Sequence, residues 1–314
     1  MLCNIRCRRQ AIGDYSGVVL KLSGVTTFKM LGVTALAISM VSTWPGCKGT
    51  GADPGSASSA RHAPSAITAA HVGSVSAAQM LADPLTSPVW QTAAWQTLGP
   101  APGHAVTPNL TRVATAWGNN DLYAAFVCVG SSGSDKPQLA SELWQHESVE
   151  FWLDTSRKQN GTDFLEIVAA PNGQWYEAQH RSADAPQPRS DGQLNLSHPF
   201  SIISMKTAGL AVYTGRGTYK GQPAWTVVVR VPLAQLPQRL RTVPAQGERF
   251  KANFIRYDWR VGDDGHRKLV QSNLFPVPTA AQAFAPYLMG ELVIGPNSPY
   301  ADVTLDSYPS GNNP

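Results

Sequence analysis

The sequence predicts an antiparallel β-sandwich of the jelly-roll or immunoglobulin-like kind. Short segments in which apolar and polar residues alternate recur between residues 110 and 294, as expected for strands with one face in a core. Turn-forming residues separate them, and the 314-residue chain contains 27 Gly and 24 Pro. No segment keeps the 3.6-residue spacing of a long helix. About ten short strands at this spacing are typical of a sandwich.

The pattern predicts four β-hairpins, each with turn-forming residues between two strand-like segments. Their segments are 112–117 with 122–129, 164–170 with 174–180, 210–216 with 225–231, and 250–259 with 268–272. Between the first two lies SVEFWLD, residues 148–154, which predicts Val149, Phe151 and Leu153 on one face and Ser148, Glu150 and Trp152 on the other. After Pro232, residues 233–236 form at most one helical turn, and 292–294 form a closing strand.

The N-terminus has the composition of an export signal followed by a linker. Basic residues up to Lys29 precede a 14-residue uncharged stretch, Met30–Thr43, which fits a signal peptide and is short for a membrane span of about 20 residues. Cys47 follows, placed like the lipidated residue of a bacterial lipoprotein. We therefore expect an export signal over 1–47, a flexible linker over 48–79, the sandwich over 80–295 and a loose tail over 296–314. The expected location is periplasmic, outer-membrane-anchored through a lipidated Cys47, or extracellular.

The charge balance excludes a nucleic-acid-binding body. The whole chain carries 25 basic and 21 acidic residues, a net +4. Residues 1–80 hold 7 basic and 2 acidic residues, so residues 81–314 hold 25 − 7 = 18 and 21 − 2 = 19, a net −1. A protein that binds nucleic acid needs a clustered basic face. Of the four cysteines only Cys128 lies in the body, which excludes a disulfide there and indicates a buried small residue.

Catalytic and metal-binding motifs are missing from the sequence: it has no phosphate-binding loop, GxSxG, HExxH, CxxC or EF-hand pattern. Glu147, Glu150, Asp154 and Glu166 are close in sequence, and glycoside cleavage needs two carboxyl groups. Glu150 and Asp154 are expected on one strand face. Carboxylates on a sandwich face, however, more often bind a cation or the hydroxyl groups of a ligand.

Tryptophan is the informative residue type, because eight of nine lie in the body. An indole offers a flat apolar face and one N–H donor, which suits the C–H face and hydroxyl rim of a sugar. Trp117, Trp152 and Trp225 are expected to be buried, where their large side chains fill the core. Trp144 stands in polar surroundings, SELWQHES, where burial is harder, so we expect it to be exposed.

Seven motifs in order between about residues 83 and 294 resemble the carbohydrate-binding module family 9 and its wider, DOMON-type β-sandwich superfamily. The most recognisable is residues 143–154, LWQHESVEFWLD, which is similar to the family's W-x-x-D-S-V-E-x-F-x-D. The other six are residues 88–90 (PVW) with Ala93, residues 113–117 (VATAW) with 121–126 (DLYAAF), residues 164–173, residues 225–236, residues 247–256 (GERFKANFIR) and residues 284–292 (FAPYLMGEL). The chain departs from the family at Glu147, Arg230, Ala285 and Met289.

The resemblance implies a non-catalytic domain that binds an oligo- or polysaccharide. By motif position, Trp144 is one wall of an aromatic clamp and Glu150 binds sugar hydroxyls. Asn253 and Arg256 match the family's N-F-x-R residues, with a role in the structure or at the site rim. The second clamp tryptophan has no clear match, and Phe284 and Tyr287 stand in its region. Family members can also bind calcium as a structural ion.

Two alternatives remain open at this stage. One is a haem-binding electron-transfer domain of the same superfamily, whose axial ligands would come from Met205, Met289, His198 or His180. The other is a glycoside hydrolase or its accessory domain, although the chain leaves no room for a catalytic domain beside the sandwich. We expect carbohydrate binding without catalysis, in the service of polysaccharide capture or degradation.

Overall fold

The computed structural model confirms the β-sandwich. It describes residues 64–102, 108–130, 140–156, 160–183, 187–188, 194–195, 201–203, 206–236, 245–262, 264–277 and 288–296. Cys47, Met205, His198, Phe284 and Tyr287 lie outside these residues, as does most of the predicted signal, linker and tail. Within the described part, no helix is both long enough and apolar enough to cross a membrane.

Two sheets face each other. The first contains β11 (Ser201–Ile203), β8 (Trp175–Arg181), β7 (Asp163–Ala169), β6 (Ser148–Asp154), β14 (Arg249–Val261) and β16 (Gly290–Ile294), with β15 (Arg267–Asn273) beside β14 and β3 (Gly99–Pro100) beside β15. The second contains β4 (Thr111–Gly118), β5 (Asp121–Val129), β13 (Gln222–Pro232) and β12 (Ala211–Tyr219), with β2 (Gln96–Thr97) beside β4. A separate pair, β9 (Gln187–Pro188) and β10 (Leu194–Asn195), completes the strands.

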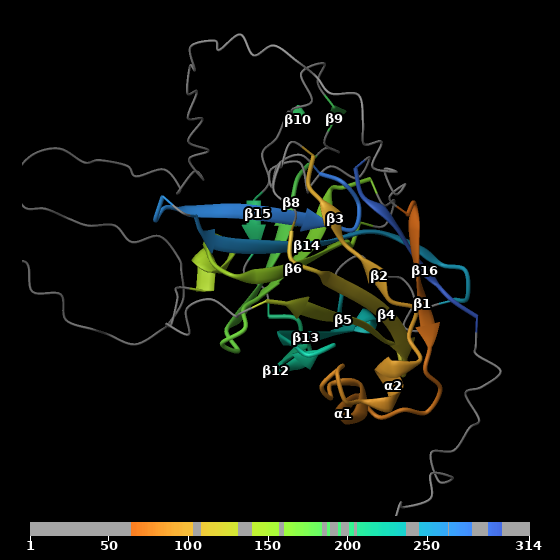
Figure 1. Cartoon of the computed structure of the whole chain (residues 1–314). Helices are drawn as coiled ribbons and strands as arrows, with labels where there is room; N and C mark the ends of the chain where they lie inside the picture. Colours follow the sequence, from red (N-terminus) through yellow and green to blue (C-terminus); the bar gives the residue numbers. More distant parts are fainter. Residues whose placement is uncertain are drawn as a thin grey trace, which may run out of the picture. The chain divides into compact units, whose positions relative to one another are not determined.

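Strand β1 (Ala66–His71) joins the two sheets at one edge. Its residues 66–69 pair in parallel with β16, and its last two residues pair in parallel with β4. Figure 1 shows β1 and β16 side by side at that edge. This strand falls within the segment that composition assigned to the linker, because AITAAH has small side chains and little apolar bulk. It also adds parallel pairs to a sandwich that is otherwise antiparallel.

The predicted hairpins are present with small changes of length. The β4–β5 turn places Asn119 and Asn120 at φ 53° and 66°, the left-handed region that asparagine tolerates and a tight hairpin requires. Strands β12 and β13 extend beyond the expected segments and meet at a tight turn through Lys220 and Gly221. The single helical turn after Pro232 is η2 (Leu233–Gln235).

The core fills the space between the sheets. Val149, Phe151 and Leu153 of β6 point into it as predicted, and Phe151 stacks on Phe254 of β14 with ring centroids 5.0 Å apart. Such aromatic pairs contribute about 1 kcal/mol beyond the burial of their area. Cys128 and Trp225 are also in this core, and Trp152 is buried on the opposite face of β6, as predicted.

Both outer faces are also covered, so β4 to β7 are buried on two sides. Over the second sheet lie the short helices α1 (Ala77–Met80) and α2 (Pro88–Gln91), visible below β4 and β12 in Figure 1. Trp90 of α2 is fully buried, and its Nε1 donates to the Met80 carbonyl at 3.0 Å. Over the first sheet, Val277 and Met289 pack on Trp152, Phe164 and Tyr257.

Candidate functional site

The segment before β6 places Trp144 on the surface. Residues 140–145 form a 3-10 helix, η1, in which Leu143 is fully buried against Val168 and Ala170. Because its neighbour Leu143 points inward, Trp144 points outward and keeps 42% of its area exposed. The sequence-based expectation that Trp144 is exposed is therefore confirmed.

Side chains from β14 and β15 fix the backbone of η1. Trp259 Nε1 donates to the Trp144 carbonyl at 3.3 Å, and an Arg267 guanidinium nitrogen donates to the Gln145 carbonyl at 3.2 Å. The Arg267 guanidinium also lies 4.9 Å from the centre of the Trp259 ring and 3.5 Å from His146 Nδ1. Trp144, His146, Trp259 and Arg267 together are called the Trp144 patch below.

The Trp144 patch has the chemistry of a ligand platform. It combines an exposed indole, a second, half-buried indole, a guanidinium and an imidazole within one surface region. Burial, and secondly the charge of Arg267, lowers the pKa of His146. The imidazole is therefore neutral at pH 7 and can both donate and accept hydrogen bonds. Trp259 and Arg267 were not anticipated, because their proximity to Trp144 depends on the pairing of β14 with β15.

Glu147 and Arg256 tie the end of η1 into the sandwich. The Arg256 guanidinium bonds to Glu147 Oε1 through Nε at 3.0 Å and Nη2 at 2.5 Å, and its Nη1 donates to Thr111 Oγ1 and the Val129 carbonyl. Arg256 is fully buried. Burial raises the pKa of Glu147 to about 7, against the opposing pull of the Arg256 charge. These contacts give Arg256 a structural role, one of the two roles left open by the sequence.

Asn253 is also fully buried and also makes structural bonds. Its Nδ2 donates to the Phe275 carbonyl at 3.0 Å, and its Oδ1 accepts from the backbone N–H groups of Phe254 and Phe275. It therefore holds the chain after β15 against β14.

Glu150 lies on the outer face of the first sheet in a buried cluster of hydrogen-bonded side chains. The cluster comprises Glu150, Glu166, Tyr176, His180 and Tyr257, and is called the carboxyl cluster below. Tyr257 donates to Glu150 at 2.6 Å, Tyr176 donates to Glu166 at 2.8 Å, and His180 Nε2 lies 2.5 Å from Glu166 Oε2. The carboxyl groups of Glu150 and Glu166 lie close enough to interact electrostatically.

Burial raises the pKa of both glutamates, and the neighbouring Glu166 raises that of Glu150 further. Burial lowers the pKa of His180 to about 4, with Glu150 opposing it, so the imidazole is neutral at pH 7. At 2.5 Å the His180–Glu166 contact is thus a strong hydrogen bond of a neutral ring rather than an ion pair. In the described structure Glu150 is 2% exposed and its partners are within the protein.

The burial of the carboxyl cluster bears on glycoside cleavage, the catalytic alternative left open by the sequence. Two catalytic carboxyl groups are separated by roughly 5–5.5 Å in retaining enzymes and 6.5–9.5 Å in inverting enzymes, so that the sugar or a water fits between them. Glu150 is 2% and Glu166 7% exposed, so neither carboxyl group is presented to a sugar at the surface. Asp154 lies further along and accepts from the backbone N–H groups of Ser156 and Gly161, both at 2.8 Å.

The residues considered for haem ligation have other partners where they are described. His180 Nε2 is engaged with Glu166, and Met289 is buried in the apolar layer over the first sheet. For a metal, no cluster of three or more His, Cys, Asp or Glu side chains with suitable geometry occurs among the described residues.

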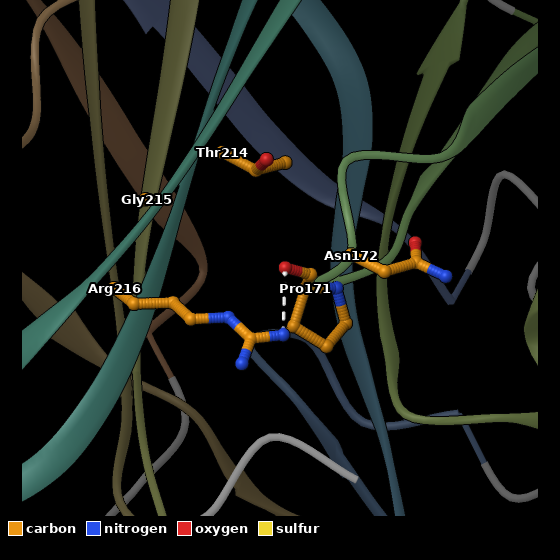
Figure 2. Close-up of a pocket in the computed structure, with 5 residues that line it drawn as sticks. All are labelled: Pro171, Asn172, Thr214, Gly215 and Arg216. Carbon is orange, nitrogen blue, oxygen red and sulfur yellow. Dashed lines mark hydrogen bonds between the residues drawn. The ribbon is translucent and has the colours of Figure 1, made fainter. Parts of the chain in front are cut away.

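A separate hollow of about 420 Å³ lies at the sandwich edge opposite β1, between the β7–β8 turn and β12. Figure 2 shows Arg216 reaching from β12 to the carbonyl of Pro171, a bond of 3.4 Å, with Thr214 on the same side of the strand. Asn172 and Gly215 complete the lining. No aromatic ring contributes to it, so it lacks the stacking surface that the Trp144 patch provides.

No protein-family model and no curated protein matches the chain. Among solved structures it is similar to a carbohydrate-binding module family 9 protein from Caldicellulosiruptor kristjanssonii in complex with glucose, at 17% identity and TM-score 0.46 over 74% of this chain and 97% of that one. It is also similar to such a module from the same organism in complex with cellotriose, at 18% identity and TM-score 0.46 over 76% of this chain and 98% of that one. A third similar structure is a Bacteroides uniformis protein with a proposed carbohydrate-binding role, at 14% identity and TM-score 0.48 over 73% of this chain and 98% of that one.

Proposed function

We propose that this protein binds a saccharide at the Trp144 patch, without catalysis. The observation that carries the proposal is the exposure of Trp144, the most exposed aromatic side chain among the described residues. Its flat apolar face is available in water and matches the C–H face of a sugar ring.

The rest of the Trp144 patch supplies directed hydrogen bonds. Arg267 has five N–H donors in a fixed plane, and neutral His146 can donate or accept. Sugar hydroxyls need both kinds of partner around a stacked ring. One exposed indole contributes about 1 kcal/mol beyond area burial, so we expect weak binding, roughly millimolar to micromolar.

The sequence adds a biological setting to the proposal. We propose that the segment before Lys48 directs export and that Cys47 anchors the protein to a membrane as a lipoprotein. A tethered saccharide-binding sandwich would then serve polysaccharide capture or degradation outside the cytoplasm.

A glycan array tests the proposal, followed by affinity electrophoresis of Trp144→Ala in the polysaccharide that scores highest. We expect the variant to lose retardation in the gel while its melting temperature stays within about 2 °C, because an exposed side chain contributes little to stability. Trp144→Phe should keep part of the retardation. Val261→Ala removes another exposed apolar side chain from β14 and serves as the matched control. Full retardation of Trp144→Ala would refute the site.

A further inference from the structure

A second group of aromatic and cationic side chains lies on the other sheet. It comprises Trp95, Arg112, Tyr219 and Lys220 and is called the Arg112 clamp below. The Arg112 guanidinium lies 5.5 Å from the centre of the Trp95 ring and 5.8 Å from that of Tyr219. The Lys220 ammonium lies 5.5 Å from the same Tyr219 ring. Two cations therefore share one short stretch of surface.

The Arg112 side chain is held in place by rigid partners. Its Nη1 donates to the Tyr219 hydroxyl at 2.7 Å. Trp95 is itself fixed, because its Nε1 donates to the carbonyl of the buried Trp90 at 2.9 Å. The N–H edge of Arg112 formed by Nε and Nη2 has no hydrogen-bond partner among the described residues. Such an edge binds the two oxygens of a carboxylate or sulfate side by side.

No carboxylate neutralises these cations within the described residues. Arg112 is half-buried, and neither it nor Lys220 has an ion-pair partner there. Asp83, whose carboxylate lies over the same sheet, is occupied by Thr226 Oγ1 and by the backbone N–H of Leu85. A partly desolvated guanidinium without a counter-charge is unfavourable, and a bound anion would supply that charge.

Lys220 sits in a backbone conformation that costs free energy. Its φ is 52°, in the left-handed region, which is unfavourable for side chains other than Gly, Asn or Asp. Glycine or asparagine would suit this hairpin turn better. A strained residue that carries a charge to the edge of a cationic group is a sign of function rather than of stability.

We propose that the Arg112 clamp binds the carboxylate or sulfate group of an acidic polysaccharide. A membrane surface is recognised by clusters of about 4–8 basic residues, and nucleic acid by an extended basic face. The clamp has two cations, one of them oriented for bidentate bonding, which matches one anionic group on one sugar unit. The proposal goes beyond the saccharide site at Trp144, because it uses different residues on the other sheet.

Calorimetric titration tests the proposal with oligogalacturonate, a heparin-derived oligosaccharide and a neutral cello-oligosaccharide as probes. We expect at least one acidic probe to bind, with an affinity that falls at high sodium chloride. Arg112→Gln and Lys220→Gly should each weaken it about tenfold or more, the loss of one charge-assisted hydrogen bond. Lys220→Gly should also keep or raise the melting temperature, so loss of binding is not loss of fold. Arg249→Gln removes an equal charge elsewhere and should leave affinity unchanged.

Trp144→Ala separates this site from the proposed function. Acidic-probe binding that persists in Trp144→Ala and falls in Arg112→Gln supports the clamp, even if no neutral glycan binds at Trp144. Failure of both acidic probes to bind, equal loss in Arg249→Gln, or loss in Trp144→Ala alone would overturn the clamp. Stronger binding to phosphatidylserine vesicles than to both acidic probes, sensitive to Arg112→Gln, would assign the clamp to a membrane surface instead.

Discussion

Replacing Arg256 by methionine tests how the end of η1 and the sandwich are held together. Methionine keeps much of the volume but removes a fully buried guanidinium, and with it the bonds to Glu147, Thr111 and the Val129 carbonyl. Breaking one side of a buried, hydrogen-bonded pair costs about 3–5 kcal/mol, because the buried polar groups that remain are left without their partner. Total stabilities are about 5–15 kcal/mol, so the loss is a large fraction.

Urea denaturation followed by tryptophan fluorescence measures this loss as a free energy of unfolding, and a thermal melt measures it as a fall in melting temperature. For a domain of this size each kcal/mol corresponds to about 2–4 °C in melting temperature, so we expect a fall of roughly 6–20 °C. Lys268→Met is the control: its bond to Asp264 is exposed on both sides, and such surface pairs contribute little to stability. A loss below about 1 kcal/mol in Arg256→Met, or equal losses in the two variants, would show that Arg256 does not hold the structure.

Two further predictions concern pH and packing. Burial raises the folded-state pKa of Glu147, Glu150 and Glu166 above the ordinary 4.5, so the native state keeps protons that the unfolded chain releases. The stability they contribute is therefore fully present below about pH 4.5 and is lost as the pH rises through their raised pKa values, of which that of Glu147 is about 7. Glu150→Gln should flatten this fall in the free energy of unfolding, and an unchanged slope would contradict the assignment. Gly290→Ala should destabilise by about 1–3 kcal/mol, since an added Cβ would lie 2.0 Å from the Phe275 ring; a neutral effect on the urea midpoint would show that the ring can move.

The strands were predictable because alternation and turn chemistry are local in sequence. The SVEFWLD segment fixed which side chains of β6 face the core, and the Asn119–Asn120 pair marked the turn after β4. Strand β1 was not predictable in this way. Its small residues carry no period, and it is held by β16 and β4, which lie far along the chain.

The site was predictable only in part, for the same reason. Polar neighbours were enough to place Trp144 on the surface. The bonds of Trp259 and Arg267 to η1 join residues more than a hundred positions apart. Likewise, contact between Glu150 and Glu166 follows from the pairing of β6 with β7, where Glu166 lies beside Trp152. Such contacts depend on strand register, which no single segment encodes.

The most direct test of the saccharide site observes the indole groups themselves. In a titration of the uniformly ¹⁵N-labelled protein with the glycan selected on the array, we predict that the Nε1–H signals of Trp144 and Trp259 shift with a common dissociation constant. The signal of Trp225, fully buried in the core, should stay in place. A saturable shift confined to other tryptophans, or no shift at Trp144 while the glycan binds, would contradict the account.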